Sequence, residues 1–175
     1  MTSDFTTSGA DDVTFMGLAL AQARRAFDAG EVPVGAIIVQ DGQVIGSGFN
    51  RREALQSPLA HAEILAIEKA AAFSRSWRLT SCDLYVTLEP CIMCVGAVLQ
   101  ARIRRLVFGC LDAKAGAVQS LYELCDDARL NHCLPVSGGV LAPESAGLLG
   151  SFFNQLRQKK RSHEIRRGGR AAEGA

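Results

Sequence analysis

The sequence has no long apolar run, only three histidines and a single tryptophan. No segment approaches the roughly 18–20 apolar residues that a bilayer-spanning helix needs, so we expect a protein without membrane attachment. The N-terminal segment Met1-Thr2-Ser3-Asp4 has neither a basic stretch nor an apolar core, which argues against a secretory signal and predicts a cytoplasmic location. The 17 glycines follow no three-residue period, so a collagen-like chain is excluded.

The composition is that of a folded domain with an uneven charge distribution. The 175 residues are 48% hydrophobic and 21% charged, which excludes extensive disorder and suits one domain with a full core. Six cysteines could form three disulfides, but in a reducing compartment cysteines more often bind metals or react. The segment from Arg157 onward has seven Lys or Arg and two Glu. A polyanion could bind this basic end, and a solvated chain end explains the charge equally well.

Hydrophobic spacing predicts one domain over residues 12–161, with a disordered N-terminus over 1–11 and a basic, disordered tail over 162–175. Helices and strands alternate after an initial hairpin whose turn is Asp41-Gly42. We expect helices over 12–29, 60–73, 90–102 and 143–161, and strands over 32–39, 43–49, 84–88, 104–109 and 134–140. This order predicts an α/β protein with a mixed sheet and helices on both faces.

Two short segments, each at the start of an expected helix, have the residues of a metal site. Cys91 and Cys94 are three residues apart, so their sulfurs share one face of a helical turn. His61 is a candidate third ligand, and a catalytic zinc ion has three protein ligands with a fourth position open to water. Glu63 follows His61 by two residues, where a carboxylate could move the proton of a metal-activated water.

Each part of this pattern has a simpler explanation when taken alone. His61 could be a structural histidine, and Cys91 with Cys94 could be a redox dithiol. A structural zinc site would need a fourth Cys or His ligand, and the other four cysteines form no second C-x-x-C pair. H-x-E followed by P-C-x-x-C is the signature of zinc-dependent deaminases, and the combined pattern favours a catalytic zinc.

Over residues 15–153 the chain resembles the bacterial tRNA-specific adenosine deaminases, within the cytidine/deoxycytidylate deaminase superfamily. This resemblance implies a cytidine-deaminase-like fold, a three-layer α/β/α sandwich with a mixed five-stranded sheet, and a homodimer. The segments that carry it are Glu31-Val32-Pro33-Val34-Gly35-Ala36, Asn50, His61-Ala62-Glu63-Ile64, Tyr85-Val86-Thr87-Leu88-Glu89-Pro90-Cys91-Ile92-Met93-Cys94, Gly96-Ala97, Val107-Phe108-Gly109, Asp112-Ala113-Lys114, Gly116-Ala117, Asn131-His132 and Phe152-Phe153.

The resemblance also implies a reaction, the hydrolytic deamination of adenosine to inosine at the wobble position of tRNA. His61, Cys91 and Cys94 would bind Zn2+, and Glu63 would shuttle the proton of the zinc-activated water. The tRNA anticodon arm would be the partner. The implied substrate-binding residues are Asn50 at the purine edge, the backbone N–H of Ala62, Val34 in the base pocket, and Asp112, Lys114, His132 and Phe153 near the RNA.

Three other functions remain as alternatives. A free nucleobase or nucleoside deaminase of the guanine or cytosine type shares the zinc chemistry but needs no RNA surface. A non-enzymatic zinc or RNA-binding module would have no use for Glu63 as a proton shuttle. A redox protein would form a Cys91–Cys94 disulfide and bind no zinc. The substrate-binding residues also have purely structural explanations. Asn50 could be a turn residue, Val34 a strand residue and His132 a structural histidine. Asp112 and Lys114 could belong to a solvated loop, and Phe153 could pack in the core.

Overall fold

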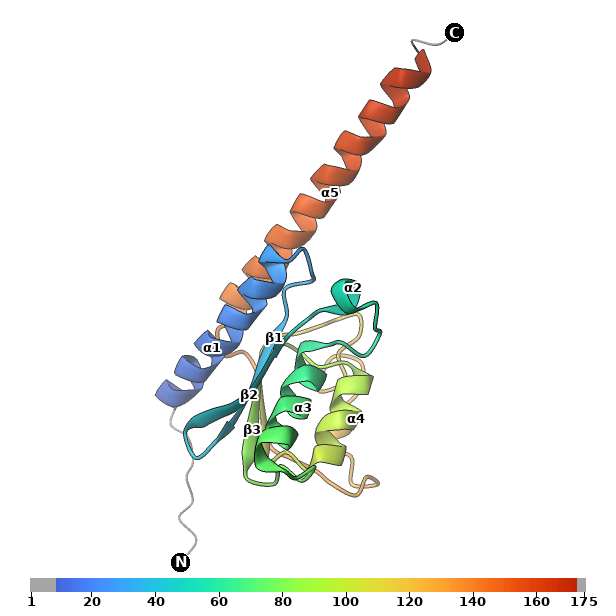
Figure 1. Ribbon diagram of the computed structural model, residues 1–175. Helices are drawn as coiled ribbons and strands as arrows, with labels where there is room; N and C mark the ends of the chain where they lie inside the picture. Colours follow the sequence, from blue (N-terminus) through green and yellow to red (C-terminus); the bar gives the residue numbers. More distant parts are fainter. Residues whose placement is uncertain (1–8, 173–175) are drawn as a thin grey trace, which may run out of the picture.

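The computed structural model describes residues 9–172, with side chains over residues 9–162. Figure 1 shows a sheet with helices on both sides and a long C-terminal helix that extends away from it. The strands are β1 (Gly35–Gln40), β2 (Gln43–Phe49), β3 (Cys82–Leu88), β4 (Arg105–Cys110) and β5 (Val136–Ser137). The helices are α1 (Gly9–Asp28), α2 (Arg52–Leu55), α3 (Ala62–Ser74), α4 (Ile92–Ala101), the short 3-10 helix η1 (Leu124–Asp126) and α5 (Ala142–Ala172).

The five strands form one mixed sheet in the order β2-β1-β3-β4-β5. Strand β1 is antiparallel to both β2 and β3, whereas β3, β4 and β5 run parallel. Strand β1 reads as a continuous apolar run because both of its faces are covered. The prediction of a mixed five-stranded α/β sheet is confirmed.

Alternate residues of the strands enter two separate cores, which defines three layers. Ala36 and Ile38 of β1 pack with α3 and α4, whereas Ile37 and Val39 pack with Met16 of α1. Figure 1 shows α1 on one side of the sheet and α3 with α4 on the other. The predicted α/β/α sandwich is therefore confirmed, because the period of two in each strand divides its side chains between the two helical layers.

Helix α3 lies unusually close to β2 because β2 contains two glycines at the contact. A Cβ atom on Gly48 would lie 2.3 Å from the backbone oxygen of Ala62, and one on Gly46 would lie 2.4 Å from that of Ala66. Only glycine fits at such a distance. This close approach fixes where the first turn of α3, and with it His61 and Glu63, lies relative to the sheet.

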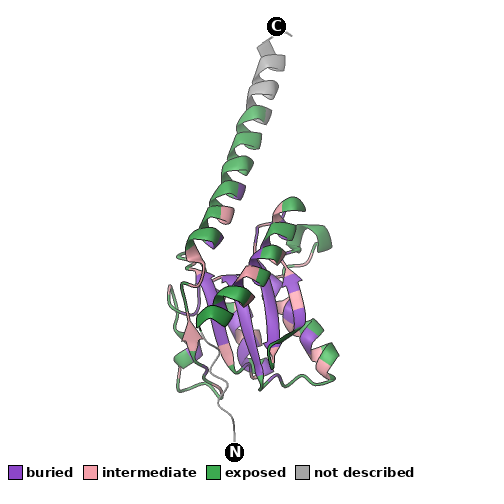
Figure 2. Ribbon diagram, turned by 90° about the vertical axis from the view of Figure 1, so that its left-hand side faces the viewer, coloured by how far each residue is buried: buried purple, intermediate pink, exposed green. Residues whose placement is uncertain are grey.

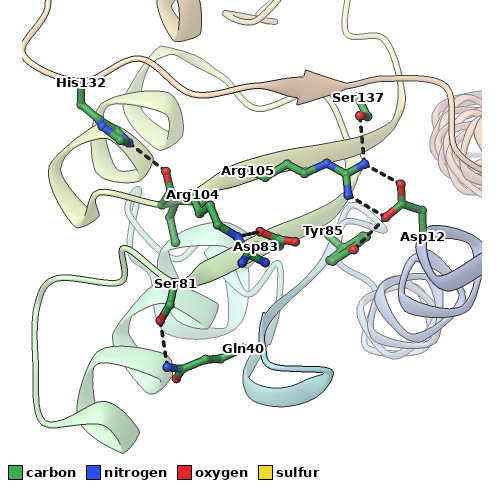
Figure 3. A network of polar contacts seen from close by, with 10 residues as sticks. Asp12, Gln40, Ser81, Asp83, Tyr85, Arg104, Arg105, His132 and Ser137 are labelled. Carbon is green, nitrogen blue, oxygen red and sulfur yellow. Dashed lines mark hydrogen bonds and ion pairs between the residues drawn. The ribbon is translucent and has the colours of Figure 1, made fainter. Parts of the chain in front are cut away.

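A polar network ties α1 to the sheet on its other face (Figure 3). The Asp12 carboxylate accepts hydrogen bonds from the Tyr85 hydroxyl at 2.8 Å and from both terminal nitrogens of Arg105, at 3.0 and 2.5 Å. Arg105 also donates to the Ser137 hydroxyl at 3.0 Å, so one guanidinium connects α1, β4 and β5. Asp12 and Tyr85 are buried, where paired charges and hydroxyls avoid the cost of an unsatisfied polar group.

The two ends of the described chain differ from the prediction. Helix α1 begins at Gly9, so residues 9–11 are helical where we expected disorder, and Asp11 and Asp12 in its first turn favour this helix end electrostatically. Helix α5 continues to Ala172 instead of ending near Arg161, since no proline follows Pro143 to interrupt it. The remaining residues of the two expected disordered segments, 1–8 and 173–175, lie outside the described residues.

Two internal predictions also need correction. The expected strand over 134–140 shrinks to Val136–Ser137, and the short helix α2 lies between residues 49 and 60, where no helix was expected. Figure 2 shows the buried sheet and the mostly exposed surface of α5. Over residues 9–172, none of the helices combines the length and apolar character that crossing a membrane requires.

Candidate active site

A cavity opens where the first turns of α3 and α4 meet. His61 is the N-cap residue of α3 and Cys91 is the N-cap residue of α4, so two helix N-termini point at the same place. Both helix dipoles favour negative charge there, such as thiolates or a hydroxide. The residues that line the cavity are Val32, Val34, Asn50, Arg52, His61, Ala62, Glu63, Leu88, Glu89, Cys91, Asp112 and Ala115.

The three predicted metal ligands lie together. The ligand atoms of His61, Cys91 and Cys94 are all within 4.8 Å of one another. Nδ1 of His61 lies 3.8 Å from the Cys91 sulfur and 3.5 Å from the Cys94 sulfur. A tetrahedral zinc ion, with Zn–S near 2.3 Å and Zn–N near 2.0 Å, requires N···S separations of about 3.5 Å. The donor set therefore fits zinc in both chemistry and spacing.

The electrostatics of the ligands are those of a site prepared for a cation. Hydrogen bonds from Cys94 and His61 lower the pKa of the Cys91 thiol to about 3, so Cys91 is a thiolate at neutral pH. The pKa of Cys94 is raised, because its proton is shared with the Cys91 sulfur and because the side chain is buried. The hydrogen bond to Cys91 raises the pKa of His61 against the opposing effect of burial.

Glu63 lies beside this ligand group but is not part of it. Its side chain is only 4% exposed, and it belongs to the lining of the cavity. Burial raises the pKa of the Glu63 carboxyl above its ordinary value. A carboxyl group whose pKa moves toward neutrality can both accept and return a proton, which is the requirement for a shuttle.

The structure brings some predicted substrate-binding residues to the cavity and leaves others outside it. Val34, Asn50, Ala62 and Asp112 line the cavity. Lys114 is exposed in the loop after Asp112, and Phe153 is 42% exposed on α5, where its ring packs edge-on against Phe152.

His132 lies away from the cavity as well. Its Nε2 is 2.8 Å from the backbone oxygen of Ile103, just past the C-terminal end of α4 (Figure 3). The cavity is at the N-terminal end of the same helix, so His132 is not one of its lining residues.

Two buried carboxylates next to the cavity were missed by the sequence prediction. Glu31, 2% exposed, accepts hydrogen bonds from the backbone N–H groups of Glu53 and Ala54 at 3.2 and 2.7 Å, and from Nδ2 of Asn50 at 3.4 Å. Glu89, also 2% exposed, accepts from the backbone N–H of Asp112 at 2.9 Å and from further groups of the same loop. The available signal was an acidic residue directly beside an apolar strand, which is unusual unless its charge is satisfied.

Burial and hydrogen bonding oppose each other at Glu89. Burial alone would raise the pKa of its carboxyl, but hydrogen bonds from the Ser120 hydroxyl and from the backbone of Gln119, Asp112 and Ser120 outweigh it and lower the pKa to about 2. Glu89 is therefore an ionised acceptor at neutral pH, unlike Glu63, and the two buried carboxyl groups of the cavity have different chemistry.

The fold and the ligand group together define a zinc-dependent deaminase domain. Residues 10–110 match the cytidine and deoxycytidylate deaminase zinc-binding region. The chain belongs to this family, which confirms the assignment of an enzyme with zinc as its cofactor and His61, Cys91 and Cys94 positioned to bind it.

Curated relatives of this chain include tRNA-specific adenosine deaminases. The chain is 44% identical over 151 residues to a tRNA-specific adenosine deaminase of Bacillus subtilis, covering 86% of this chain and 94% of the relative. It is 46% identical over 151 residues to the tRNA-specific adenosine deaminase of Haemophilus influenzae, covering 86% and 87% of the two chains. The resemblance noted from the motifs is thus confirmed over most of the chain.

Among solved structures, a tRNA deaminase is also more similar to this chain than a guanine deaminase is. One from a study of A-to-I editing by tRNA:A34 deaminases at the wobble position of transfer RNA has a TM-score of 0.75 and 45% identity, covering 77% of this chain and 98% of that one. A guanine deaminase from Nitrosomonas europaea has a TM-score of 0.67 and 26% identity, covering 80% and 83% of the two chains. The free-base deaminase shares the fold at much lower identity.

Proposed function

We propose that the protein deaminates adenosine to inosine at the wobble position, the first position of the anticodon, in tRNA. The observation that carries this proposal is the group of His61, Cys91 and Cys94 beside buried Glu63, in a chain 44–46% identical to tRNA-specific adenosine deaminases. In favour of the alternative, a free guanine or cytosine deaminase, stands a structural match to a guanine deaminase at 26% identity.

Glu63 carries out the proton transfers of the proposed reaction. A zinc ion held by His61, Cys91 and Cys94 would act as a Lewis acid and would lower the pKa of a coordinated water toward neutrality. Glu63 accepts a proton from the attacking water and delivers it to N1 of the adenine ring. It then takes the remaining proton from the oxygen added at C6 and passes it to the amino group on C6, the C6–N bond breaks, and the products are inosine and ammonia.

Three cavity residues bind the base in this proposal. Asn50 supplies a carboxamide to the purine edge, since a side-chain amide can both donate to and accept from adenine. Ala62 offers its backbone N–H, which is among the first N–H groups of α3 that have no partner within the helix. Val34 adds an apolar contact at the cavity wall. Their position in the lining supports all three assignments.

The proposed RNA contacts outside the cavity extend over a larger surface. Asp112 and Lys114 belong to the loop that borders the cavity, which supports a contact with the anticodon nucleotides. Phe153 is exposed enough to stack on a base. His132, bound at the far end of α4, would have to contact a more distant part of the anticodon arm.

The basic end of the chain is a further candidate for RNA binding. If the lysines and arginines from Arg157 onward contact phosphates, deleting residues 157–175 weakens binding and flattens its salt dependence by about 0.7–0.9 in log–log slope for each lost contact. The measurement is the affinity for an anticodon stem-loop at several salt concentrations. An unchanged slope would assign this segment to a solvated end.

We also propose a cytoplasmic homodimer. A tRNA substrate supports the location. Three apolar side chains next to site residues in the sequence support the self-association, because Leu59, Ile92 and Leu111 are between 57% and 59% exposed and would lose contact with water in a dimer interface. Sedimentation should give a species of twice the monomer mass of 18.7 kDa. A monomer at micromolar concentration would contradict the dimer.

The proposed function is tested by mapping inosine on a pool of tRNAs after incubation with the zinc-loaded protein. We expect inosine at the first anticodon position of a subset of tRNAs, with about one zinc per chain in the same sample. Free adenosine, guanine and cytosine are incubated in parallel. Turnover of a free base without inosine in tRNA would favour the nucleobase deaminase instead.

A further inference from the structure

Glu89 connects the zinc-ligand segment to a separate loop. It follows the last residue of β3, Leu88, and comes two residues before Cys91. Its Oε1 accepts hydrogen bonds from the backbone N–H groups of Val118, Gln119 and Ser120 at 3.1, 2.7 and 2.9 Å. Its Oε2 accepts from the Ser120 hydroxyl and from the Asp112 N–H at 2.9 Å. Five donors of the loop 112–120 thus converge on one carboxylate.

The same loop also contacts the ligand segment through its backbone. The N–H of Ala117 donates to the Pro90 oxygen at 2.9 Å, and Gly116 forms an isolated antiparallel bridge with Cys91. A Cβ atom on Gly116 would lie 2.3 Å from the Glu89 carboxylate, so the loop packs directly on this group. Asp112, at the start of the loop, and Ala115, within it, line the cavity.

Two other kinds of contact support the loop: Ala117 and Val118 are buried in the core, and Asp112 accepts hydrogen bonds from N–H groups within the loop. Residues 112–120 belong to none of the named helices and strands of the described chain, so their N–H groups have no continuous ladder of backbone partners. A carboxylate that accepts several backbone N–H groups replaces that ladder, and charge-assisted hydrogen bonds are stronger than neutral ones. Removing the acceptor would leave these donors to be satisfied by water, and residues 118–120 would be held less rigidly.

We propose that Glu89 is a positioning residue whose carboxylate holds the loop 112–120 against the Cys91 segment in the conformation that receives the RNA. This inference rests on the proposed function, because the loop contains Asp112 and Lys114. A preorganised loop lowers the conformational entropy lost on binding. Freeing the loop should therefore raise KM for RNA more than it lowers kcat, since the zinc ligands and Glu63 stay in place.

The experiment compares Glu89→Gln and Gly116→Ala in the zinc-loaded full chain. A glutamine keeps the size of Glu89 but turns an NH2 group toward backbone donors. Gly116→Ala keeps the carboxylate but displaces the loop from it. Glu123→Gln is the control, because Glu123 is exposed three residues beyond Ser120.

Glu31→Gln is a matched comparison. Glu31 is as buried as Glu89 but accepts from the backbone of α2 instead of the loop 112–120. It distinguishes loss of this particular loop anchor from loss of any buried carboxylate.

Four quantities are measured on each protein: bound zinc, amide hydrogen exchange, and kcat and KM on an anticodon stem-loop. For Glu89→Gln and Gly116→Ala we expect zinc to stay at the wild-type level and exchange at residues 118–120 to rise at least about tenfold. KM should rise about tenfold while kcat changes by less than about threefold. For Glu31→Gln the increase in exchange should be confined to residues 50–54. Glu123→Gln should match the wild type.

Several outcomes would overturn the proposal. Faster exchange in the loop with an unchanged KM would show that its position does not serve the RNA. Loss of zinc with an unchanged KM would assign Glu89 to the metal site instead. If Glu89→Gln does not fold, Gly116→Ala decides the question. If the wild-type protein forms no inosine, the proposed function fails, and unchanged exchange in both variants would separately refute the anchoring role.

Discussion

At the scale of single residues, the two buried carboxyl groups of the cavity, Glu63 and Glu89, have pKa values that their surroundings shift in opposite directions. Glu63 has a raised pKa because burial is its dominant influence, whereas Glu89 has a pKa of about 2 because five donors oppose burial. One group is suited to exchange protons and the other to accept hydrogen bonds permanently. Their separate roles follow from these surroundings, since the side chains are chemically identical.

Replacing Glu63 with Ala should leave zinc bound and reduce inosine formation by about 10²–10⁴-fold, the usual contribution of a general acid–base group. The measurement is the rate of inosine formation together with the metal content of the same sample. Glu68→Gln is the control, because Glu68 is exposed on the same helix. Turnover near the wild-type rate in Glu63→Ala would remove Glu63 from the mechanism.

The cysteines outside the metal site should differ in reactivity. The structure has all six cysteines as free thiols, including Cys91 and Cys94 of the metal site. Burial raises the pKa of Cys125 to about 11, so at pH 8 only about one molecule in a thousand has the reactive thiolate. Iodoacetamide should therefore modify exposed Cys133 and spare Cys125, as read by peptide mass mapping. Labelling of Cys125 in the folded protein would contradict its burial, and Cys133→Ser identifies the Cys133 signal.

At the scale of secondary-structure elements, the position of the site depends on how closely α3 packs on β2. Gly46 and Gly48 remove the side chains that would otherwise separate the helix from the strand. His61 is the N-cap residue of α3 and directly precedes Ala62, whose backbone oxygen is part of this contact. Strand β2 therefore determines the position of the first turn of α3, and with it the position of the metal ligand His61.

Substituting Gly48 with Ala should destabilise the protein by more than about 2 kcal/mol, because the new Cβ would overlap the Ala62 backbone oxygen and overpack the contact. Gly17→Ala is the matched control. Gly17 is in the interior of α1 with no atom within 4 Å of the added Cβ, so alanine should stabilise the fold by about 0.5–1 kcal/mol. Urea unfolding measures the free energy of unfolding of both variants. If Gly48→Ala and Gly17→Ala changed this free energy by the same amount, the packing argument would be refuted.

The features that could be predicted from the sequence are those that depend on the spacing of residues close together in the chain. Cys91 and Cys94 are one helical turn apart and His61 opens the other helix, so the metal ligands were accessible without tertiary information. The role of Glu89 was not, because its donors come from residues 23 to 31 positions later in the chain. The same holds for Glu31, whose partners lie 19 to 23 positions away. Long-range polar contacts leave no periodic signal in the sequence.

At the scale of the whole molecule, the metal site joins segments that the chain connects only through β3. His61 and Cys91 are 30 residues apart in sequence and cap two different helices. A zinc ion bound by both would therefore act as a crosslink between α3 and α4, and it would stabilise the folded state by a free energy that grows with the logarithm of its affinity.

Removing zinc with a chelator should lower the melting temperature. For zinc at a thousandfold excess over its Kd, the loss is about 4 kcal/mol in the free energy of unfolding. Thermal unfolding with and without chelator measures it, and readdition of zinc should restore the original value. Glu63→Ala should respond in the same way, because Glu63 is not in the ligand group. An unchanged melting temperature in the presence of the chelator would rule out the crosslink.

The exposed part of helix α5 should unfold independently of the rest of the domain. It has 31 residues and a length of about 46 Å, and from Phe153 through Ser162 each described side chain is exposed. Without tertiary packing, the helical content of this stretch depends on its own helix–coil equilibrium. On warming it should fray progressively while the sheet unfolds in one cooperative transition. A polyanion that neutralises its lysines and arginines would shift the same equilibrium toward helix, so part of the binding free energy would be spent on ordering this segment.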